Sequence, residues 1–467
     1  MGIRNTLTGI IKGTPWENHV YLVGGCVRDD LMGNPIKDVD LVVDLPDGGI
    51  RLAEWLKEKG HSTQDVVVYP RYGTAMFRLV AFPDDEIEAV QTRKEKYPDT
   101  GSRNPETVFG TLHDDCFRRD LTINAMYFNL SENQFIDPTG KGVEDLNGHV
   151  IRTTSDPNIV YDDDPLRILR CIRFASRFRW DIDKETWQGM LNNVDRLSII
   201  TSERMRDELN KMLIAGNQVQ AMNLLAESGA LYYVIPELQE TLTMSQNKYH
   251  FGTVWQHTMK VLVELSCDDP VLMMAGLLHD IGKIVTRSVS ADGSVHFIMH
   301  EIESQRLAEE ILKRLKYPNS YIEDVCFLVR NHMHTKFWKD DLSMMKDKHL
   351  RRLQYLCGSE HRFGQLLRLI DADNRAHAEA YCLYQQAGRI QECSEALVQN
   401  GTAMFRYNPP LTGKDVMAIT GLGQGVHIRA FLQNLLKLSF VNPVRTRKEW
   451  EAQVRSFYKS YSKSLQK

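Results

Sequence analysis

Strand-like alternation of apolar and polar positions fills the first third of the chain, and helical periodicity fills the rest. The segments VYLVGG, DLVV, MFRLVAF and EIEAVQTR and the stretch around FIDP are typical of strands, whereas LAEWLKEKG is an amphipathic helix that ends at Gly60. From Tyr161 onward the period-two pattern disappears and the helical period continues to the end. The pattern predicts an α+β protein with a head of strands and helices followed by helices only.

The length of 467 residues exceeds what one hydrophobic core can organise and indicates about three or four domains. We expect a head over residues 1–150, a helical neck over 151–225, a helical body over 226–395 and a helical tail over 396–467.

Composition narrows the class of protein. The net charge is only -4, so any nucleic-acid surface must be local. The 8 cysteines are scattered without close pairs, which favours reduced thiols in the cytoplasm over a disulfide scaffold or a zinc finger. No apolar run approaches the ~20 residues of a membrane span, and the N-terminus lacks the apolar core of a signal peptide. The composition therefore predicts a cytoplasmic protein without a membrane partner.

One stretch near the start carries candidate chemistry. YLVGGCVRDDLMGNPIKDVDLVV predicts a strand, a Gly-Gly turn, a short helix and a second strand with Asp38 and Asp40. Carboxylates two residues apart on a strand share a face and repel each other unless a cation lies between them. Hard cations such as Mg²⁺ bind a few carboxylates together with substrate phosphates. Gly24 and Gly25 would let backbone amides approach a triphosphate, and Arg28 would add positive charge.

This stretch resembles the catalytic signature of the DNA polymerase β-type nucleotidyltransferase superfamily. GGCVRD followed by DVD is similar to its CCA-adding tRNA nucleotidyltransferase and bacterial poly(A) polymerase branch. The resemblance implies a mixed-sheet polymerase β-type head and a third acid on the strand EIEAVQTR, where Glu88 is favoured over Glu86. The segment KEKYPDTGSRNPETVFGTL is rich in turn residues and resembles the flexible loop of complete CCA-adding enzymes.

FRRDLTINAMYFN resembles the family motif RRDxTxNA, with Leu121 where phenylalanine is often found. The resemblance implies that Arg119 and Asp120 contact the ribose and phosphates of the incoming nucleotide. Asp120 is a candidate helix N-cap, and Asn124 follows it by one helical turn, so the two side chains can share a face.

YDDDPLRILRCIRFASRF predicts a helix with four arginines along one face, at Arg167, Arg170, Arg173 and Arg177. Like charges at this spacing repel, so the row predicts a bound anion, with phosphate the natural one.

Asp164 lies one turn before Arg167, so an acceptor and a donor can stand side by side. Cytosine and adenine both present an amino group next to an unprotonated ring nitrogen, which this pair would fit. Guanine and uracil present the reverse pattern and would leave both groups unpaired. The segment resembles the EDxxR motif of class II CCA-adding enzymes, with Asp163 in place of glutamate. An N-terminal Asp–Arg salt bridge is the plain alternative.

Two further segments complete the neck and tail. TSERMRDELNKML (201–213) contributes Arg204 and Arg206 and is assigned a structural role, because a similar family stretch braces the nucleotide-reading helix. The tail from Lys437 onward mixes lysines and arginines with Phe457, Tyr458 and Tyr461, which suits contacts to a tRNA acceptor arm. A solvated C-terminus is the alternative.

The body carries a second constellation, which is similar to the HD phosphohydrolase superfamily. Its members are His257, His279, Asp280, His300, His332 and Asp373. Imidazole and carboxylate together suit Mn²⁺, Ni²⁺, Co²⁺ or Fe²⁺ better than Mg²⁺. Asp371 competes with Asp373, and His296 and His334 compete with their neighbours. Lys283 of HDIGK would be available for phosphate.

Together these motifs predict a class II CCA-adding tRNA nucleotidyltransferase that takes CTP and ATP, with a possible phosphatase or 2′,3′-cyclic phosphodiesterase in the body. A bacterial poly(A) polymerase and a CC-only or A-only enzyme are the near alternatives. An HD phosphohydrolase with a nucleotide-binding regulatory head is the alternative from another class.

Overall fold

The computed structural model describes residues 2–36, 38–63, 65–70, 73–96, 106–250, 252–408 and 410–465. The chain divides into two compact units, Met1–Gln239 and Glu240–Lys467. The joints predicted near residues 150 and 395 fall inside these units and stay predictions. Among the described residues, no helix is long and apolar enough to cross a membrane.

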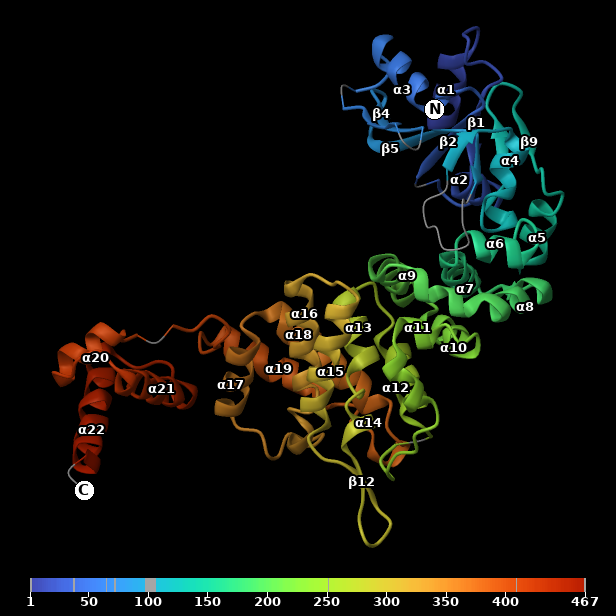
Figure 1. Cartoon of the computed structure of the whole chain (residues 1–467). Helices are drawn as coiled ribbons and strands as arrows, with labels where there is room; N and C mark the ends of the chain where they lie inside the picture. Colours follow the sequence, from blue (N-terminus) through green and yellow to red (C-terminus); the bar gives the residue numbers. More distant parts are fainter. Residues whose placement is uncertain are drawn as a thin grey trace. The chain divides into compact units, whose positions relative to one another are not determined.

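The first unit begins with a mixed sheet of seven strands in the order β3-β4-β5-β2-β1-β8-β9 (Figure 1). Strands β2 and β5 run parallel, and the other neighbours in the sheet are antiparallel. The strands are β1 (Val20–Val23), β2 (Val39–Val43), β3 (Val67–Tyr69), β4 (Thr74–Leu79), β5 (Phe82–Gln91), β8 (Tyr127–Asn129) and β9 (Gln134–Ile136). The mixed-sheet head that the resemblance implies is confirmed.

Helices accompany this sheet in the head. They are α1 (Ile3–Ile11), α2 (Gly25–Leu31), α3 (Gly48–Glu58), α4 (Leu112–Phe117) and α5 (Gly142–Gly148). The amphipathic α3 packs its apolar face on β2, β4 and β5, where Leu52, Ala53 and Leu56 are fully buried. Its packing holds the two parallel strands that carry the candidate acids.

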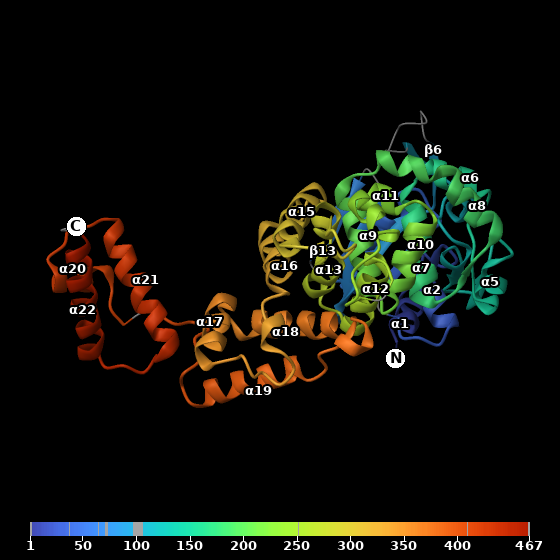
Figure 2. The same cartoon turned by 90° about the horizontal axis from the view of Figure 1, so that it is seen from below.

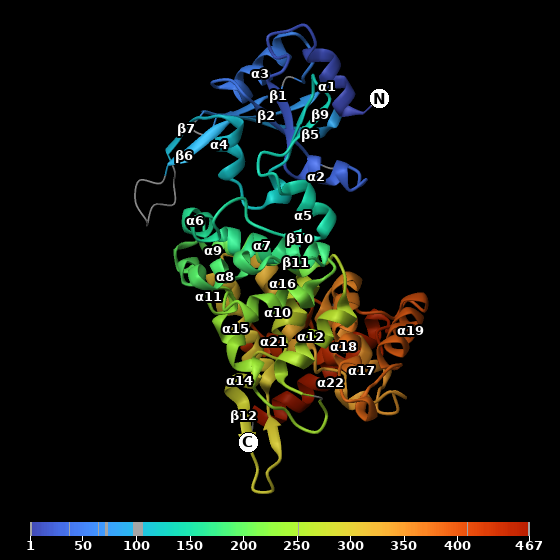
Figure 3. The same cartoon turned by 90° about the vertical axis from the view of Figure 1, so that its right-hand side faces the viewer.

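The sequence interpretation needs two corrections in the head. The segment predicted as a mobile loop contains two antiparallel strands, β6 (Arg93–Lys96) and β7 (Glu106–Phe109), which lie beside α4 (Figure 3). The rest of that predicted loop, residues 97–105, lies outside the described residues. Asp120 caps no α-helix, because residues 122–124 form one 3₁₀ turn and the chain then continues as β8.

The neck is a set of helices that follows the sheet. They are α6 (Pro157–Asp163), α7 (Leu166–Phe178), α8 (Lys184–Asn193), α9 (Ser202–Ile214), α10 (Gln218–Glu227) and α11 (Leu231–Val234). Pro165 separates α6 from α7. The helix α7 packs on α9 and α10, and its Leu169, Cys171 and Ile172 are buried. A short parallel pair, β10 (Val150–Ile151) with β11 (Asp181–Ile182), interrupts the predicted run of helices.

The second unit is a helical body that continues into a small helical tail. The body contains α12 (Val254–Leu265), α13 (Pro270–Leu278), α14 (Lys283–Thr286), α15 (His300–Arg314), α16 (Asn319–Asn331), α17 (Asp347–Cys357), α18 (Glu360–Arg375) and α19 (Gln386–Gln399). It is not all-helical, because β12 (Arg287–Val289) and β13 (Val295–Phe297) form a hairpin that projects from the helices (Figure 1, Figure 3).

The tail consists of α20 (Gly413–Thr420), α21 (Val426–Val441) and α22 (Arg447–Leu465), which pack together (Figure 2). Its core is built from Val416, Phe431, Leu435 and Trp450, all at most 1% exposed. Tyr458 and Tyr461, predicted as RNA-contacting aromatics, are partly buried against this core. Their packing role therefore limits how much of each ring can face RNA.

Replacing Gly49 by alanine is expected to destabilise the first unit by about 1–3 kcal/mol. An added Cβ would lie 2.4 Å from the Ala89 carbonyl oxygen of β5, so α3 or β5 must shift. Gly9→Ala in α1 is the matched control, because nothing lies within 4 Å of its added Cβ, and it should stabilise the protein slightly. Thermal unfolding of both variants checks this; equal melting temperatures would contradict the close approach of α3 to β5.

Candidate functional site

Three carboxylates gather at the end of the parallel strand pair in the head. Asp40 on β2 lies opposite Glu88 on β5 in the strand register, and Asp38 immediately precedes β2. Burial, followed by the charges of Glu88 and Asp38, raises the pKa of Asp40 to about 6, although the charge of Arg119 acts to lower it. Glu86 points elsewhere and pairs with Arg78 at 2.8 Å. The arrangement favours a bound cation, which would compensate the repulsion.

Gly24 makes room between the acids and the nearest guanidinium. Its φ is +74°, a left-handed value that favours glycine. A Cβ added there would lie 3.6 Å from Arg119 Nη1 and 3.7 Å from Asp40 Oδ2. A side chain at this position would therefore fill the space between a cation site and an arginine.

Arg119 is held in place by residues that the sequence interpretation missed. Its Nη2 donates to Asp115 Oδ2 at 2.9 Å, and the Tyr127 hydroxyl donates to the same oxygen at 2.7 Å. Asp115 is fully buried; burial alone would raise its pKa, but Arg119 and Arg118 hold that pKa well below its usual value. The only available signal was the acidic pair of LHDDCF one turn before the arginines.

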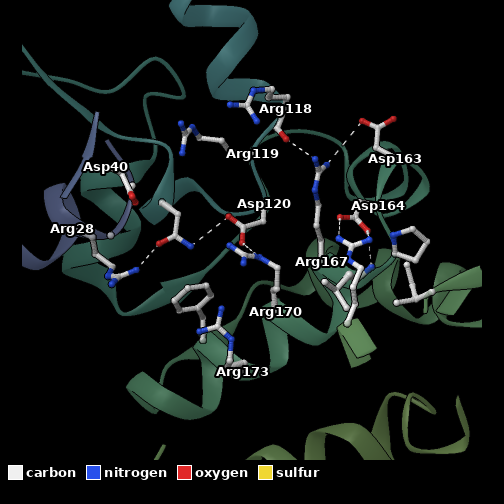
Figure 4. A pocket seen from close by; sticks show the side chains of 18 of the residues that line it. Arg28, Asp40, Arg118, Arg119, Asp120, Asp163, Asp164, Arg167, Arg170 and Arg173 are labelled. Carbon is white, nitrogen blue, oxygen red and sulfur yellow. Dashed lines mark hydrogen bonds and ion pairs between the residues drawn. The ribbon is translucent and has the colours of Figure 1, made fainter. Parts of the chain in front are cut away.

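A chain of hydrogen bonds links the Gly-Gly turn to α7 (Figure 4). Arg28 Nη1 donates to Asn124 Oδ1 at 2.6 Å, Asn124 Nδ2 donates to Asp120 Oδ1 at 3.4 Å, and Arg170 Nε donates to Asp120 Oδ2 at 2.7 Å. Burial would raise the pKa of Asp120, but Arg170 more than offsets this and lowers it to about 2. Asp120 and Asn124 do share a face, through a 3₁₀ turn rather than an α-helix.

The arginines of the row on α7 have acceptor partners in the structure that their spacing in the sequence does not predict. Arg170 pairs with Asp120, and Arg173 Nε donates to Glu208 of α9 at 2.6 Å. Arg167 donates to two backbone carbonyls, at 3.1 Å to Val160 and 2.5 Å to Arg118. The bound anion predicted from the row stays a prediction, because acceptors from elements distant in sequence already pair with these arginines.

Asp164 also pairs differently from the sequence expectation. Its carboxylate accepts two hydrogen bonds from Arg204 of α9, at 2.7 and 3.3 Å. The Asp–Arg salt bridge at the start of α7 thus exists, with Arg204 in place of Arg167. The family-based assignment of the 201–213 segment to a structural role missed this side chain.

These residues surround one cavity of about 840 Å³ within the first unit (Figure 4). Of the site residues predicted in this unit, all but Glu88 line it. They are Gly24, Gly25, Arg28, Asp38, Asp40, Arg119, Asp120, Asn124, Asp164, Arg167, Arg170 and Arg173. Arg93, Arg118, Arg177 and Arg204 also line the wall. The cavity is thus acidic at the β2 strand and rich in guanidinium groups elsewhere, which suits a metal-bound polyphosphate.

The predicted histidines and aspartates of the body come together in the second unit. His257, His279 and Asp280 form one group whose ligand atoms lie within 4.8 Å of one another, and Asp280, His300 and His332 form another. Asp373 joins the first group, with Oδ1 3.1 Å from His257 Nε2. Asp280 is shared by both groups, so the arrangement can hold two metal ions.

Backbone carbonyls orient all four imidazoles. The Nδ1 atoms of His257, His279, His300 and His332 lie 2.7–3.3 Å from the carbonyl oxygens of Ala376, Gly276, Phe297 and Val329. This assigns the proton to Nδ1 and leaves Nε2 as the ligand atom. Burial and the neighbouring histidines lower the pKa of His332 to about 3, which keeps it neutral. Neutral imidazole is the form that binds transition metals.

Two lysines neutralise the carboxylates of this centre. Lys283 Nζ lies 2.6 Å from Asp280 Oδ2, and Lys336 Nζ lies 2.9 Å from Asp373 Oδ2. Lys283, predicted to face phosphate, is thus engaged within the centre, and the sequence interpretation missed Lys336. The competing candidates lie apart: Asp371 pairs with Arg375, and His296 is exposed on β13.

Three family models match the chain. They are the poly A polymerase head domain over residues 20–152, the probable RNA and SrmB-binding site of polymerase A over 180–242, and the HD domain over 248–374.

Curated relatives and solved structures agree with these models. The chain is 32% identical to a multifunctional CCA protein of Haemophilus ducreyi, over 79% of this chain and 88% of that protein. It is 29% identical to an A-adding tRNA nucleotidyltransferase of Deinococcus radiodurans, over 94% and 95% of the two chains. Its fold matches the Bacillus stearothermophilus CCA-adding enzyme in complex with CTP, with a TM-score of 0.69, 20% identity, and coverage of 99% and 100%. The chain therefore belongs to the tRNA nucleotidyltransferase family of the multifunctional CCA proteins, with a poly A polymerase head and an HD domain.

Proposed function

We propose that this protein is a nucleotidyltransferase that adds and repairs the 3′-terminal CCA of tRNA from CTP and ATP, without a nucleic-acid template. The observation that carries the proposal is the single cavity that joins the acids of β2 to the polar start of α7. Such a cavity can hold a triphosphate at one end and a nucleobase at the other. The names of its relatives, among them the multifunctional CCA protein, support the same reaction. We propose the cytoplasm as its compartment, which its unbridged cysteines suit.

We assign the head the work of phosphoryl transfer. Asp38, Asp40 and Glu88 would hold Mg²⁺, which when bound lowers the charge of the triphosphate and activates the tRNA 3′-hydroxyl. Arg119 lies beside Gly24 and would bind the triphosphate, because it is aimed by Asp115 toward the acids. Gly25 and Arg28 line the same wall.

We assign base selection to the start of α7. Asp164 would accept from the amino group of cytosine or adenine, and Arg167 would donate to the adjacent ring nitrogen. The Nη1 and Nη2 atoms of Arg167 already donate to the carbonyl oxygens of Val160 and Arg118. A guanidinium has five N–H groups, so further donors remain for the base. Asp120 and Asn124 hold Arg170 and Arg28 in place, and Arg173 is fixed by Glu208. The tRNA acceptor arm would supply the reacting hydroxyl.

A second function is favoured by the body's centre. We propose that it binds Mn²⁺, Ni²⁺, Co²⁺ or Fe²⁺ and hydrolyses phosphate esters, because four oriented Nε2 atoms and two carboxylates converge there. A metal at this centre would activate water for attack on phosphorus. Lys283 and Lys336 would keep Asp280 and Asp373 ionised and correctly turned.

Transcripts that end before, within and after CCA test the principal proposal. With CTP and ATP together, the protein is expected to restore each transcript to CCA and then stop. Addition of A only, as for the Deinococcus relative, would restrict the reaction to the last step. Long untemplated A-tracts would instead identify a poly(A) polymerase, and the absence of any transfer would contradict the proposal.

Asp40→Asn is expected to abolish transfer, by about 10³-fold or more, while raising thermal stability in Mg²⁺-free buffer at pH 7.5. The pKa of Asp40 is raised to about 6, so the folded state holds its charged form unfavourably above that pH. Removing the charge should therefore stabilise the protein by about 1–3 kcal/mol at pH 7.5, with the gain disappearing as the pH falls below 6.

Glu86→Gln is the matched control, because Glu86 is exposed and pairs with Arg78 away from the acids. It should keep activity and leave the melting temperature nearly unchanged. Retained activity in Asp40→Asn, or a lower thermal stability of this variant at pH 7.5, would contradict the assignment of Asp40 to a cation site.

His279→Ala is expected to remove Ni²⁺- or Mn²⁺-dependent hydrolysis of a generic phosphodiester by at least about 100-fold, because a neutral imidazole ligand is lost. Nucleotide transfer should persist, since the head is a separate compact unit. His296→Ala on the exposed hairpin serves as control. Hydrolysis no greater in the wild type than in His279→Ala would reduce the centre to a structural role.

A further inference from the structure

Asp164 is held by two sets of donors in the neck. Arg204 donates to both of its carboxylate oxygens, with Nη2 2.7 Å from Oδ2 and Nη1 3.3 Å from Oδ1. The Leu166 N–H donates to Oδ1 at 3.2 Å. The carboxylate is therefore turned by α9 on one side and by the first turn of α7 on the other.

These contacts leave a defined acceptor capacity. A carboxylate has about four lone-pair positions, and the described contacts use one on Oδ2 and two on Oδ1. One position on Oδ2 stays open, and Asp164 lines the cavity. Because a guanidinium and a backbone N–H can only donate, both oxygens act as acceptors in this arrangement.

An open acceptor next to a fixed one distinguishes the bases. The amino groups of cytosine and adenine each offer a hydrogen to such a position. The corresponding atom of uracil and guanine is a carbonyl oxygen, which would face the carboxylate with no hydrogen between them. Leaving a buried acceptor pair unmade costs about 1–3 kcal/mol, which is roughly a 5- to 150-fold preference.

We propose that Arg204 is a positioning residue for base selection. It fixes Asp164 as an acceptor that binds an amino group of the base and repels a carbonyl oxygen. This inference rests on the proposed nucleotidyl transfer and assigns the neck helix α9 a part in its specificity. Arg204 acts through Asp164 and forms no bond to the reacting atoms.

Arg204 is poorly suited to a purely structural role. Its side chain is 43% exposed, and exposed ion pairs contribute little to folding stability. The helix α9 is anchored independently by buried Met205, Leu209 and Met212 and by the Glu208–Arg173 pair. Loss of the guanidinium should therefore change the behaviour of Asp164 while α9 stays in place.

The test compares single-nucleotide addition by the wild type, Arg204→Met and Arg204→Lys on a tRNA transcript that lacks CCA. The kcat/KM values for CTP and UTP are measured separately for each protein. In Arg204→Met, the CTP-over-UTP preference is expected to fall about 10-fold or more, because Asp164 can then turn and no longer presents a fixed acceptor. Arg204→Lys keeps one charged donor and should restore part of the preference.

Arg206→Met is the matched control on the same helix. Arg206 pairs with its neighbour Asp207, and it is not among the described residues that line the cavity. The CTP-over-UTP preference and the melting temperature of Arg206→Met should equal those of the wild type. A melting temperature for Arg204→Met within about 2 °C of the wild type accompanies the expected result.

Two results would overturn the inference. If Arg204→Met lowers kcat/KM for CTP and UTP equally, Arg204 binds phosphate or RNA and does not position Asp164. If the preference is unchanged with full activity, the pair has no part in selection. Failure of the proposed function itself is distinguishable, because the wild type would then add neither nucleotide.

Discussion

The head is organised around carboxylates that must stay charged at close range. Asp40 lies half-buried opposite Glu88 across the parallel β2–β5 pair, and burial with like charge makes its ionised form costly. Arg119 supplies part of the compensating charge and is itself oriented by the buried Asp115. Gly24 leaves the intervening space free of a side chain. The sheet thus presents a place where a divalent cation and a polyphosphate together complete the charge balance.

In the neck, positive charges on α7 are likewise compensated by partners from other elements. Each arginine on α7 that faces inward meets an acceptor from another element: Arg170 meets Asp120, and Arg173 meets Glu208. These pairs fix the helix against the sheet-derived segment on one side and against α9 on the other. Asp164 differs, since its described contacts leave one acceptor position on Oδ2 open and the residue lines the cavity. We propose that this rigid protein edge selects the base in place of a template strand.

Sequence reasoning succeeded where the chemistry is contiguous. The Gly-Gly turn and Asp-x-Asp strand lie within one unit of structure, so their meeting follows from local geometry alone. The histidines and aspartates of the body were found through their resemblance to the HD superfamily, and the structure brings them together. Sequence reasoning failed where interacting residues are distant along the chain. Arg204 lies forty residues after Asp164, and nothing in either segment specifies that α9 packs on α7. The β6–β7 strands and the β12–β13 hairpin were missed because polar strands lack an apolar alternation.

The most direct measurement is a crystal structure of the protein with CTP and Mg²⁺. The triphosphate should contact both Gly24 and Arg119, and the cytosine amino nitrogen should lie about 2.7–3.2 Å from Asp164 Oδ2. The Arg204–Asp164 pair should persist in that complex. A cytosine bound away from the start of α7, or an Asp164 that releases Arg204 and turns out of the cavity, would contradict base selection by a fixed protein edge.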